Sequence, residues 1–331
     1  MQGAQSPPVS LLVVDIGGTK VSSAWWERGQ LREVRSRPMA RDEAGFVALL
    51  QDLHRDYPHA RQLGVAVTGR AVAGVVRAVN AAMIGFWNGY PLAARMAGVG
   101  LPAPLLLNDA QAAAWGEFRA DVEAAGGRPS SEGTGGGAGD EAADTDRDLL
   151  FVTLSTGVGG GLVLGGRLQS GAAGLAGHIG HVGSARRAVD GDQACSCGRR
   201  NCMETVASGT ALARQGRHIL GRDCTAQEVL ERAMSGDVAM QQVVDVAAAA
   251  VAQALADARA LTGVARVRLG GGLGLAPVMF DAIERALREL PSLFVPVLEP
   301  ARLGAHAGLI GVGWWAVAPS GDDAREPSDV H

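Results

Sequence analysis

Short apolar runs alternate along the chain with longer amphipathic segments, a pattern typical of α/β proteins, in which strands alternate with helices. We expect strands at Leu11–Val14, Val21–Trp26, Leu63–Thr68, Leu105–Leu107, Leu149–Leu154, Leu162–Leu164 and Val264–Leu269. We expect helices at Phe46–Tyr57, Ala110–Arg119, Gln241–Leu261, Pro277–Leu290 and Ala307–Ala318.

One arrangement occurs twice in this pattern: an apolar strand, a glycine-rich turn and a second apolar strand. It spans 11–26, around Gly17-Gly18, and again 149–164, where the turn is expected to run over 155–161. Two similar halves that each open with such a hairpin predict an α/β protein with two lobes and a cleft. We expect an N-terminal lobe over 1–122, joined by the C-terminal helix at about 306–318, and a C-terminal lobe over 149–305.

The segment between the two lobes, 123–148, has a different composition. It is dominated by glycine, alanine and acidic residues and contains few side chains that a core could bury. Such a composition predicts a flexible glycine-rich insertion, to which we assign no function.

The overall composition restricts the class of protein. Hydrophobic residues make up 47% of the 331 residues and charged residues 19%, enough for a buried core and unlike a disordered chain. The formal net charge of −4 argues against nucleic acid or an anionic membrane as a partner. No apolar run of about 18–20 residues predicts a membrane span, and residues 1–10 lack a signal-peptide pattern. We therefore expect a cytoplasmic protein.

Three of the four cysteines lie within eight residues of one another, at Cys195, Cys197 and Cys202. Three thiolates at this spacing can share one tetrahedral Zn²⁺, which takes a fourth nitrogen or sulfur ligand. The residues alone leave His178 and His181 open as that ligand. A site with four protein ligands has no open position, so the zinc would be structural. Cys224 is not close to the other three and is expected to be an inert core thiol.

Glycine clusters follow three of the predicted strands, at Gly17-Gly18, at 157–161 and at 270–272. Backbone N–H groups in such turns can approach phosphate oxygens closely. A dinucleotide-binding G-x-G-x-x-G fails at 157–162, because its third glycine would fall on Leu162 and a strand follows it instead of a helix. Asp15, at a strand end beside the first turn, could hold hydrated Mg²⁺, while Thr19 supplies a hydroxyl and Lys20, the only lysine, a positive charge.

Asn108 and Asp109 follow another predicted strand and precede a helix. Both residue types are favoured as helix N-caps. A carboxylate at this place could also act as the general base that phosphoryl transfer to an alcohol requires. The two roles are compatible, and both remain open at this point.

The segments 15–20 (Asp-Ile-Gly-Gly-Thr-Lys) and 155–161 (Ser-Thr-Gly-Val-Gly-Gly-Gly) resemble the nucleotide-binding signature shared by sugar kinases, heat-shock chaperones and actin. Within that superfamily the chain is similar to the ROK family from Leu11 to about Ala318. The resemblance implies a two-lobed actin-like ATPase fold (ribonuclease H-like) with ATP and a sugar in the central cleft. The implied ATP- and phosphate-binding residues are Asp15, Gly17, Gly18, Thr19, Lys20, Thr156, Gly157, Gly159, Gly160, Gly271 and Gly272.

The same resemblance implies roles for the remaining candidates. Asp109 would be the general base, and the sugar ligands would be Gly69, Asn108, His178 and Glu204. The segment 177–181 resembles the family's Gly-Glu-x-Gly-His, whose last residue binds zinc, so the implied metal ligands are His181, Cys195, Cys197 and Cys202. The stretch 185–192 between His181 and Cys195 is longer than is usual in the family and is expected to bulge out.

Segments 108–118 and 174–181 resemble the N-acetylmannosamine kinase branch of the family, in particular because His178 replaces a glutamate. This implies transfer of the ATP γ-phosphate to the 6-hydroxyl of N-acetylmannosamine, a step of sialic acid catabolism, by a homodimer. Met83 stands where relatives carry a sugar-contacting Asn, which leaves a glucokinase or another hexosamine kinase as the alternative. A sugar-responsive ROK repressor is disfavoured, since the ten residues before Leu11 are too few for a helix-turn-helix. A chaperone-like or actin-like ATPase is disfavoured by the cysteine motif and the Asn108-Asp109 pair.

Overall fold

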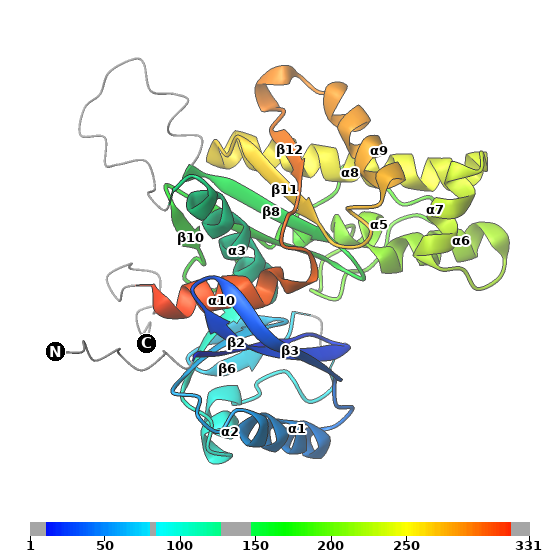
Figure 1. The fold of residues 1–331 in the computed structure, drawn as a ribbon. Helices are drawn as coiled ribbons and strands as arrows, with labels where there is room; N and C mark the ends of the chain where they lie inside the picture. Colours follow the sequence, from blue (N-terminus) through cyan, green and yellow to red (C-terminus); the bar gives the residue numbers. More distant parts are fainter. Residues whose placement is uncertain (1–10, 80–83, 127–146, 319–331) are drawn as a thin grey trace, which may run out of the picture. The chain divides into compact units, whose positions relative to one another are not determined.

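The computed structural model describes residues 11–79, 84–126 and 147–318 (Figure 1). These residues form two compact α/β units, each built on a five-stranded sheet. Unit 1 contains the described residues up to Gly116, together with 172–174 and 306–318. Unit 2 contains the described residues of 117–171 and 175–305. Residues 117–122, which the sequence assigns to the first lobe, therefore group with unit 2.

The sheet of unit 1 has the order β3-β2-β1-β4-β7. Its strands are β1 (Leu11–Ile16), β2 (Lys20–Glu27), β3 (Gln30–Pro38), β4 (Gln62–Val67) and β7 (Pro104–Asn108). Strands β1, β4 and β7 run parallel, so their carboxyl ends meet at one edge of the sheet, whereas β2 and β3 are antiparallel. A small hairpin of β5 (Arg70–Val72) and β6 (Val75–Arg77) follows β4.

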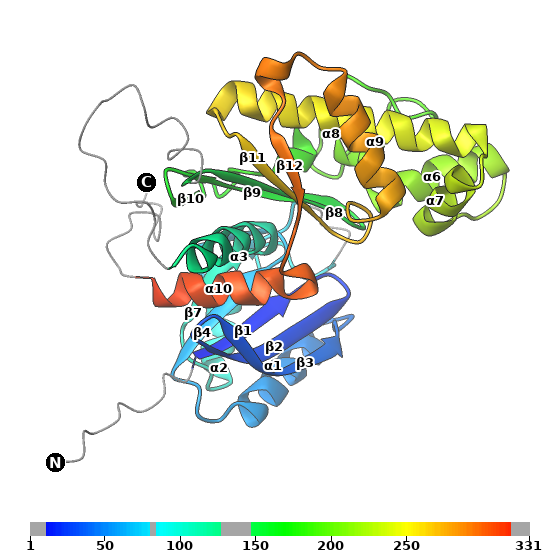
Figure 2. The same cartoon turned by 45° about the horizontal axis from the view of Figure 1, so that its top comes forward.

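Helices cover both faces of this sheet. Helices α1 (Glu43–Asp56) and α2 (Leu92–Gly98) lie on one face, and α10 (Ala307–Val317) lies on the other (Figures 1 and 2). Helix α3 (Asp109–Ala124) begins directly after β7, and its first half belongs to unit 1. It crosses α10 so closely that a Cβ on Gly311 would lie 1.6 Å from the carbonyl oxygen of Ala112, so this crossing requires glycine.

The sheet of unit 2 repeats the topology of unit 1, with the order β10-β9-β8-β11-β12. Its strands are β8 (Leu149–Leu154), β9 (Val158–Leu164), β10 (Arg167–Gln169), β11 (Arg266–Gly270) and β12 (Val297–Pro300). Here β8, β11 and β12 are parallel, and β9 returns antiparallel from β8. The repeated hairpin therefore opens each unit, as the sequence predicts.

The helices of unit 2 are α5 (Glu204–Ala207), α6 (Gly209–Leu220), α7 (Ala226–Met234), α8 (Val238–Thr262) and α9 (Pro277–Arg288). Three short 3-10 helices, η2 (Ile179–His181), η3 (Ser292–Phe294) and η4 (Gly304–His306), complete the described elements. Helix α8 is long and apolar enough to cross a membrane by length and composition alone. More than half of its most apolar window is buried, and its buried residues belong to the core of unit 2, which accounts for its composition.

The predicted strands and helices are confirmed in place, but one turn differs in extent and several observed elements were not predicted. Strand β3 was not predicted, because this edge strand is exposed along most of its length and carries no apolar alternation. The glycine turn predicted over 155–161 is wrong in extent, since β9 already begins at Val158. Strands β5, β6, β10 and β12 and helices α2, α5, α6 and α7 were also not predicted. Residues 127–146 of the predicted insertion, and Met83, lie outside the described residues.

Candidate functional site

The candidate residues of unit 1 gather at the carboxyl edge of its parallel strands. In register, Ile16 of β1 pairs with Val67 of β4, and Val67 pairs with Asn108 of β7. Asp15 therefore lies one residue before this row, while Gly69 and Asp109 lie just beyond it. The carboxyl edge of parallel strands is where α/β proteins commonly bind ligands.

Two carboxyl groups lie at this edge, and the charge of Asp15 acts on Asp109. Burial and, after it, the negative charge of Asp15 raise the pKa of Asp109 to about 7, against hydrogen bonds from Ala110 and Asn108 that lower it. Burial also raises the pKa of Asp15 to about 6, while the charge of Lys20 acts in the opposite direction. A carboxyl that titrates near neutral pH can accept a proton from a reacting group, so Asp109 has the chemistry of a general base.

The Asn108 side chain performs two tasks. Its Oδ1 accepts hydrogen bonds from the backbone N–H groups of Ala110 (3.0 Å) and Gln111 (3.1 Å), so that Asn108 caps α3. Its Nδ2 donates to the carbonyl of Gly69 (2.9 Å) and to Oδ1 of Asp109 (3.0 Å). The Ala110 N–H also ends on Oδ1 of Asp109, at 2.8 Å. These bonds fix the orientation of the Asp109 carboxylate.

The first glycine turn connects β1 to β2. The N–H of Gly17 donates to the carbonyl of Lys20 at 3.0 Å, and Thr19 and Lys20 are exposed. The Asp15 carboxylate also lies against the first turn of α10, where a Cβ on Gly308 would be 3.0 Å from Oδ2 of Asp15. Gly308 was not predicted as a site residue, although a glycine inside an otherwise apolar helix can signal close packing.

The second and third glycine clusters lie on neighbouring parallel strands of unit 2. The turn after β8 comprises Ser155, Thr156 and Gly157, and β11 runs beside β8 and ends at Gly270. The turn after β11 folds over the end of β8, where the N–H groups of Leu273 and Gly274 both donate to the carbonyl of Leu154. Gly271 has φ +83 and leaves no room for a Cβ, which would lie 2.1 Å from that carbonyl, whereas Gly272 is unobstructed.

Gly159 and Gly160 lie within strand β9, opposite Thr153 and Val152. A Cβ on Gly160 would lie 2.5 Å from the carbonyl oxygen of Gly177 and 2.9 Å from Cγ2 of Ile179. Close packing of the 177–181 segment is therefore sufficient reason for glycine at 160. The phosphate-binding role implied for these two glycines stays a prediction.

Glu204, implied as a sugar ligand, lies against the second glycine turn. Its Oε2 accepts a hydrogen bond from the N–H of Val158 at 3.0 Å and would lie only 2.9 Å from a Cβ on Gly157. The carboxylate therefore braces the turn between β8 and β9. Its distance in sequence from that turn explains why pattern alone did not reveal this contact.

The four implied metal ligands converge in unit 2. The ligand atoms of His181, Cys195, Cys197 and Cys202 all lie within 4.8 Å of one another. Nδ1 of His181 lies 3.5 Å from Sγ of Cys195, and the Sγ atoms of Cys197 and Cys202 are 3.7 Å apart. A tetrahedral Zn²⁺ with Zn–S bonds of about 2.3 Å separates its ligands by about 3.8 Å, so this donor set fits zinc.

The electrostatics of the thiols agree with a cation site. Burial and, after it, the neighbouring sulfurs of Cys197 and Cys195 raise the pKa of Cys202 to about 12. Burial likewise raises the pKa of Cys195. Three thiolates this close together need a bound cation to stay deprotonated.

The stretch 185–192, expected to bulge out, is exposed over 185–187 and anchored at Val189 and Asp190. Asp190 pairs with Arg214 of α6 at 2.6 Å, and the N–H of Val189 donates to the fully buried Gln215 at 3.0 Å. His178 lies beside the metal ligands, with its ring centroid 6.4 Å from that of His181. Cys224 is buried in the core of unit 2, as predicted.

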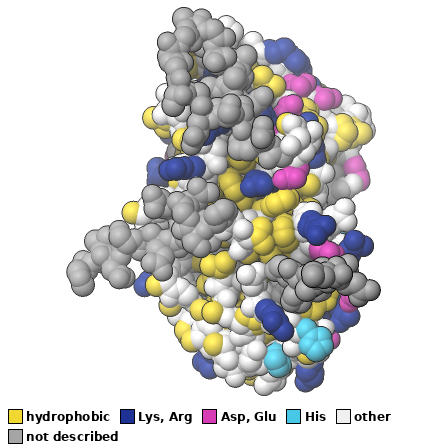
Figure 3. Space-filling model, turned by 60° about the vertical axis from the view of Figure 1, so that its left-hand side comes forward, with side chains coloured by type: hydrophobic (Ala, Val, Ile, Leu, Met, Phe, Trp, Pro, Cys, Tyr) yellow, Lys and Arg dark blue, Asp and Glu magenta, His cyan; other side chains and the backbone are white. Residues whose placement is uncertain are grey.

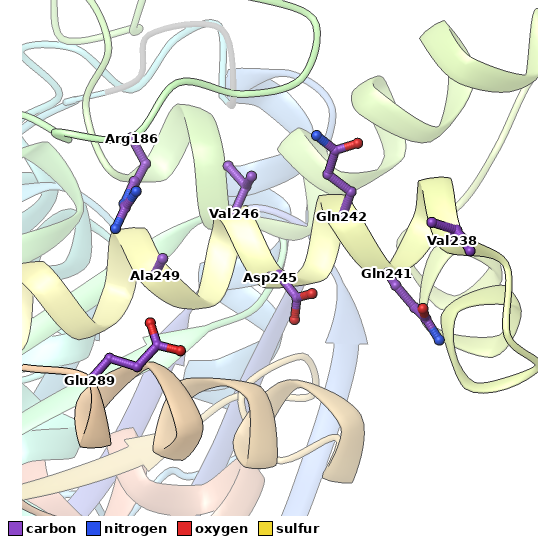
Figure 4. Close-up of a pocket in the computed structure, with 8 residues that line it drawn as sticks. All are labelled: Arg186, Val238, Gln241, Gln242, Asp245, Val246, Ala249 and Glu289. Carbon is purple, nitrogen blue, oxygen red and sulfur yellow. The ribbon is translucent and has the colours of Figure 1, made fainter.

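The surface was also compared with the predicted site residues for hollows and basic patches. A hollow in unit 2 runs along α8, and its lining residues include none of the predicted site residues (Figure 4). It is lined by Arg186, Val238, Gln241, Gln242, Asp245, Val246, Ala249 and Glu289. On the face drawn in Figure 3, the Lys and Arg side chains are spread among acidic and apolar ones and form no single basic patch.

Comparison with known proteins assigns the family. The model described as "ROK family" matches residues 134–318. N-acetylmannosamine kinase from Yersinia pseudotuberculosis serotype O:3 (strain YPIII) is 36% identical over 312 residues, which cover 93% of this chain and 98% of that relative. The chain therefore belongs to the ROK family.

Solved structures agree with this assignment. The ROK hexokinase from Thermus thermophilus superposes with a TM-score of 0.72 at 27% identity, covering 92% of this chain and 97% of that one. A ROK family glucokinase from Streptomyces griseus, in complex with glucose and AMPPNP, gives a TM-score of 0.70 at 26% identity and covers 92% of this chain and 98% of that one. The predicted fold class, a two-lobed actin-like ATPase fold, is thereby confirmed. The central cleft and the role of each residue in it stay predictions.

Proposed function

We propose that this protein is an ATP-dependent kinase that phosphorylates the 6-hydroxyl of N-acetylmannosamine. The observation that carries the catalytic part is the Asp109 carboxylate, held at the sheet edge by Asn108 with a pKa of about 7. The choice of sugar is supported by the 36% identity to N-acetylmannosamine kinases over nearly the whole chain.

In the proposed reaction Asp109 accepts the proton of the sugar's 6-hydroxyl as that oxygen attacks the γ-phosphorus of ATP. The bond between the γ-phosphorus and the bridging oxygen breaks, and ADP leaves. The products are the sugar 6-phosphate, ADP and one proton, which Asp109 releases to solvent. The hydrogen bonds from Asn108 and Ala110 both end on Oδ1, so Oδ2 is the oxygen we assign to the proton transfer.

Two loops would hold the nucleotide phosphates: the Gly17-Gly18 turn with Thr19, and the turn formed by Thr156 and Gly157. We assign Gly271 and Gly272 to the adenosine side. Asp15 would hold Mg²⁺, which neutralises the developing phosphate charge. The Asp15 carboxyl fits this role, because burial penalises its negative charge and a bound cation would offset that penalty. Among the described residues, Lys20 is the positive charge that lowers its pKa.

The zinc site would be structural. His181, Cys195, Cys197 and Cys202 provide four ligands and leave no open position for a substrate. The site would fix the segment that carries His178 and the loop that leads into Glu204. We assign both residues to the sugar, together with Gly69 and Asn108.

A glucokinase is the second candidate. It is favoured by the likeness to the Streptomyces griseus enzyme, whose structure contains glucose. Against it, His178 stands where the family's glutamate would accept hydrogen bonds from sugar hydroxyls. A neutral imidazole can accept one hydrogen bond and donate one, which a 2-acetamido sugar can also satisfy.

The proposed setting is sialic acid catabolism in the cytoplasm, with a homodimeric enzyme.

The test is one coupled assay of ADP release with N-acetylmannosamine, glucose, N-acetylglucosamine and fructose as acceptors. We expect the highest kcat/KM with N-acetylmannosamine and only slow ATP consumption without sugar. Asp109→Asn is the matched control and should abolish ADP release with every acceptor. A preference for glucose would favour the second candidate, and equal ATP hydrolysis with and without sugar would contradict both.

A further inference from the structure

Trp87 is a buried side chain with no role in the proposed chemistry, yet its polar atom points toward the site. It is 1% exposed and lies in unit 1. Its indole Nε1–H donates to the backbone carbonyl of Thr68 at 2.8 Å. Thr68 follows β4 and precedes Gly69, at the same sheet edge as Asp15 and Asp109.

Aromatic packing fixes this indole ring in place. Its ring centroid lies 5.3 Å from that of Phe46 in an edge-to-face contact and 5.6 Å from that of Tyr90 in a stacked one. Phe86 contacts the same cluster, with its centroid 5.9 Å from Trp87. A ring held on several sides can orient its N–H without losing further rotamer freedom.

The loop that this N–H reaches contains a position of high backbone freedom. Gly69 has φ +95, and a Cβ there would lie 2.8 Å from the carbonyl of Arg77, so only glycine fits. A glycine peptide flips more easily than others. The Thr68 N–H donates to the carbonyl of Ile16 at 3.0 Å, and the Thr68 carbonyl is held by Trp87. The first bond holds the peptide between Val67 and Thr68, and the bond from Trp87 holds the peptide between Thr68 and Gly69.

The next carbonyl along the chain continues the connection. The carbonyl of Gly69 accepts from Nδ2 of Asn108, and the same Nδ2 donates to Oδ1 of Asp109. An ordered series of hydrogen bonds thus runs from Trp87 through the 68–69 backbone and Asn108 to the carboxylate.

We propose that Trp87 is a positioning residue that orients the Asp109 carboxylate through this series of hydrogen bonds. The proposal rests on the proposed function, in which Asp109 accepts the sugar proton. Trp87 itself bonds to the Thr68 carbonyl and would act on the carboxylate only through it.

The test compares Trp87→Phe with Trp26→Phe. Both replace a buried indole of unit 1 by a phenyl ring, and the Trp26 N–H has no hydrogen-bond partner among the described residues. Trp26→Phe therefore reproduces the loss of ring volume without the loss of a hydrogen bond. We measure kcat and KM for sugar and ATP, together with the melting temperature.

We expect Trp87→Phe to lower kcat about fivefold to tenfold, the loss that corresponds to one buried hydrogen bond, with the KM for ATP unchanged. Trp26→Phe should lower the melting temperature comparably and leave kcat unchanged. An equal fall of kcat in both variants would mean that Trp87 acts only through packing, which would overturn the proposal.

A double-mutant cycle tests the route. Asn108→Ser keeps a helix-capping oxygen and removes the amide N–H groups. If the series is correct, Trp87→Phe has little further effect on kcat in the Asn108→Ser background. Additive losses would overturn the route through Asn108.

A third measurement is independent of turnover, so it separates this inference from the proposed function. The NMR signals of the Asn108 side-chain amide should shift in Trp87→Phe and stay in place in Trp26→Phe. An unshifted Asn108 signal in Trp87→Phe would overturn the proposal even in an active kinase. Shifted signals would support it even if the acceptor proved to be a different sugar.

Discussion

Replacing Asp109 by Asn should remove activity and stabilise unit 1 at the same time. The substitution keeps the shape of the side chain and an oxygen that can accept the N–H of Ala110. It removes the charge that burial and Asp15 oppose. Loss of a general base costs about 10²-fold to 10⁴-fold in rate, so ADP release should fall by at least two orders of magnitude.

The stability gain follows from the raised pKa of Asp109. A carboxyl with a folded-state pKa of about 7, against an ordinary value of 3.8, is protonated more readily in the folded chain. Its contribution to stability is therefore fully present below pH 3.8 and is lost as the pH rises through 7. Each tenfold change in proton affinity corresponds to 1.36 kcal/mol, so the complete loss of folding stability is about 4 kcal/mol. About 3 kcal/mol of this loss falls between pH 5 and pH 8. The Asn side chain does not titrate and has no such loss, so the free energy of unfolding of the variant should exceed that of the wild type by more at pH 8 than at pH 5.

The assay uses the position of the tryptophans in the chain. All six tryptophans lie in unit 1, so tryptophan fluorescence during urea denaturation reports the unfolding of the unit that contains Asp109. The measurement is made without Mg²⁺ and nucleotide, which would bind near the carboxylates. The free energies of unfolding of wild type and variant are compared at pH 5 and pH 8.

Asp56→Asn is the matched control in the same unit. Hydrogen bonding to Arg37 lowers the pKa of Asp56, and Arg35 lies 3.3 Å away. Its stabilising contribution is present at high pH and lost as the pH falls, so the same chemical change should slightly destabilise the protein at pH 8. If the Asp109→Asn difference is the same at pH 5 and pH 8, Asp109 bears no burial penalty and the reasoning is wrong.

Three further predictions concern unit 2. Cys197→Ser should lower the zinc content and the melting temperature together, and a full zinc complement measured by atomic absorption would remove Cys197 from the site. His178→Glu should raise the kcat/KM for glucose relative to N-acetylmannosamine, because a carboxylate accepts hydrogen bonds from ring hydroxyls; an unchanged ratio would contradict the assignment of His178 to the sugar. Gly160→Ala should push away the segment carrying His181 and cost about 1–3 kcal/mol of stability with partial zinc loss. An unchanged thermal melt would show that this contact relaxes freely.

Much of the fold could be predicted because its strands are apolar and bounded by glycines. The hairpins that open each unit were visible in the pattern around Asp15 and again after Leu154. Strand β3 was missed because an exposed edge strand needs no buried face. The end of the second glycine turn was misplaced because glycine in β9 reflects the packing of the 177–181 segment, a contact distant in sequence.

Some residues of the candidate site could likewise be predicted from the sequence, and others could not. The spacing of Cys195, Cys197 and Cys202 revealed the cluster directly, since ligands on one short loop are close by necessity. The choice of His181 over His178 required the family resemblance, and the structure brings the Nδ1 of His181 to the cluster. The contribution of Trp87 had no sequence signal, because a tryptophan in an apolar segment has the pattern of any core aromatic.

The sequence by itself determined the local chemistry of this protein: which strands end in carboxylates, which turns are glycine-rich and which cysteines can share a metal. Those features depend on neighbouring residues and on the short periods of strands and helices. Only the tertiary structure decided that β1, β4 and β7 lie side by side, which brings Asp15 close enough to Asp109 to shift its pKa. The order of strands in a sheet is set by packing between segments far apart in the chain, and no local pattern encodes it.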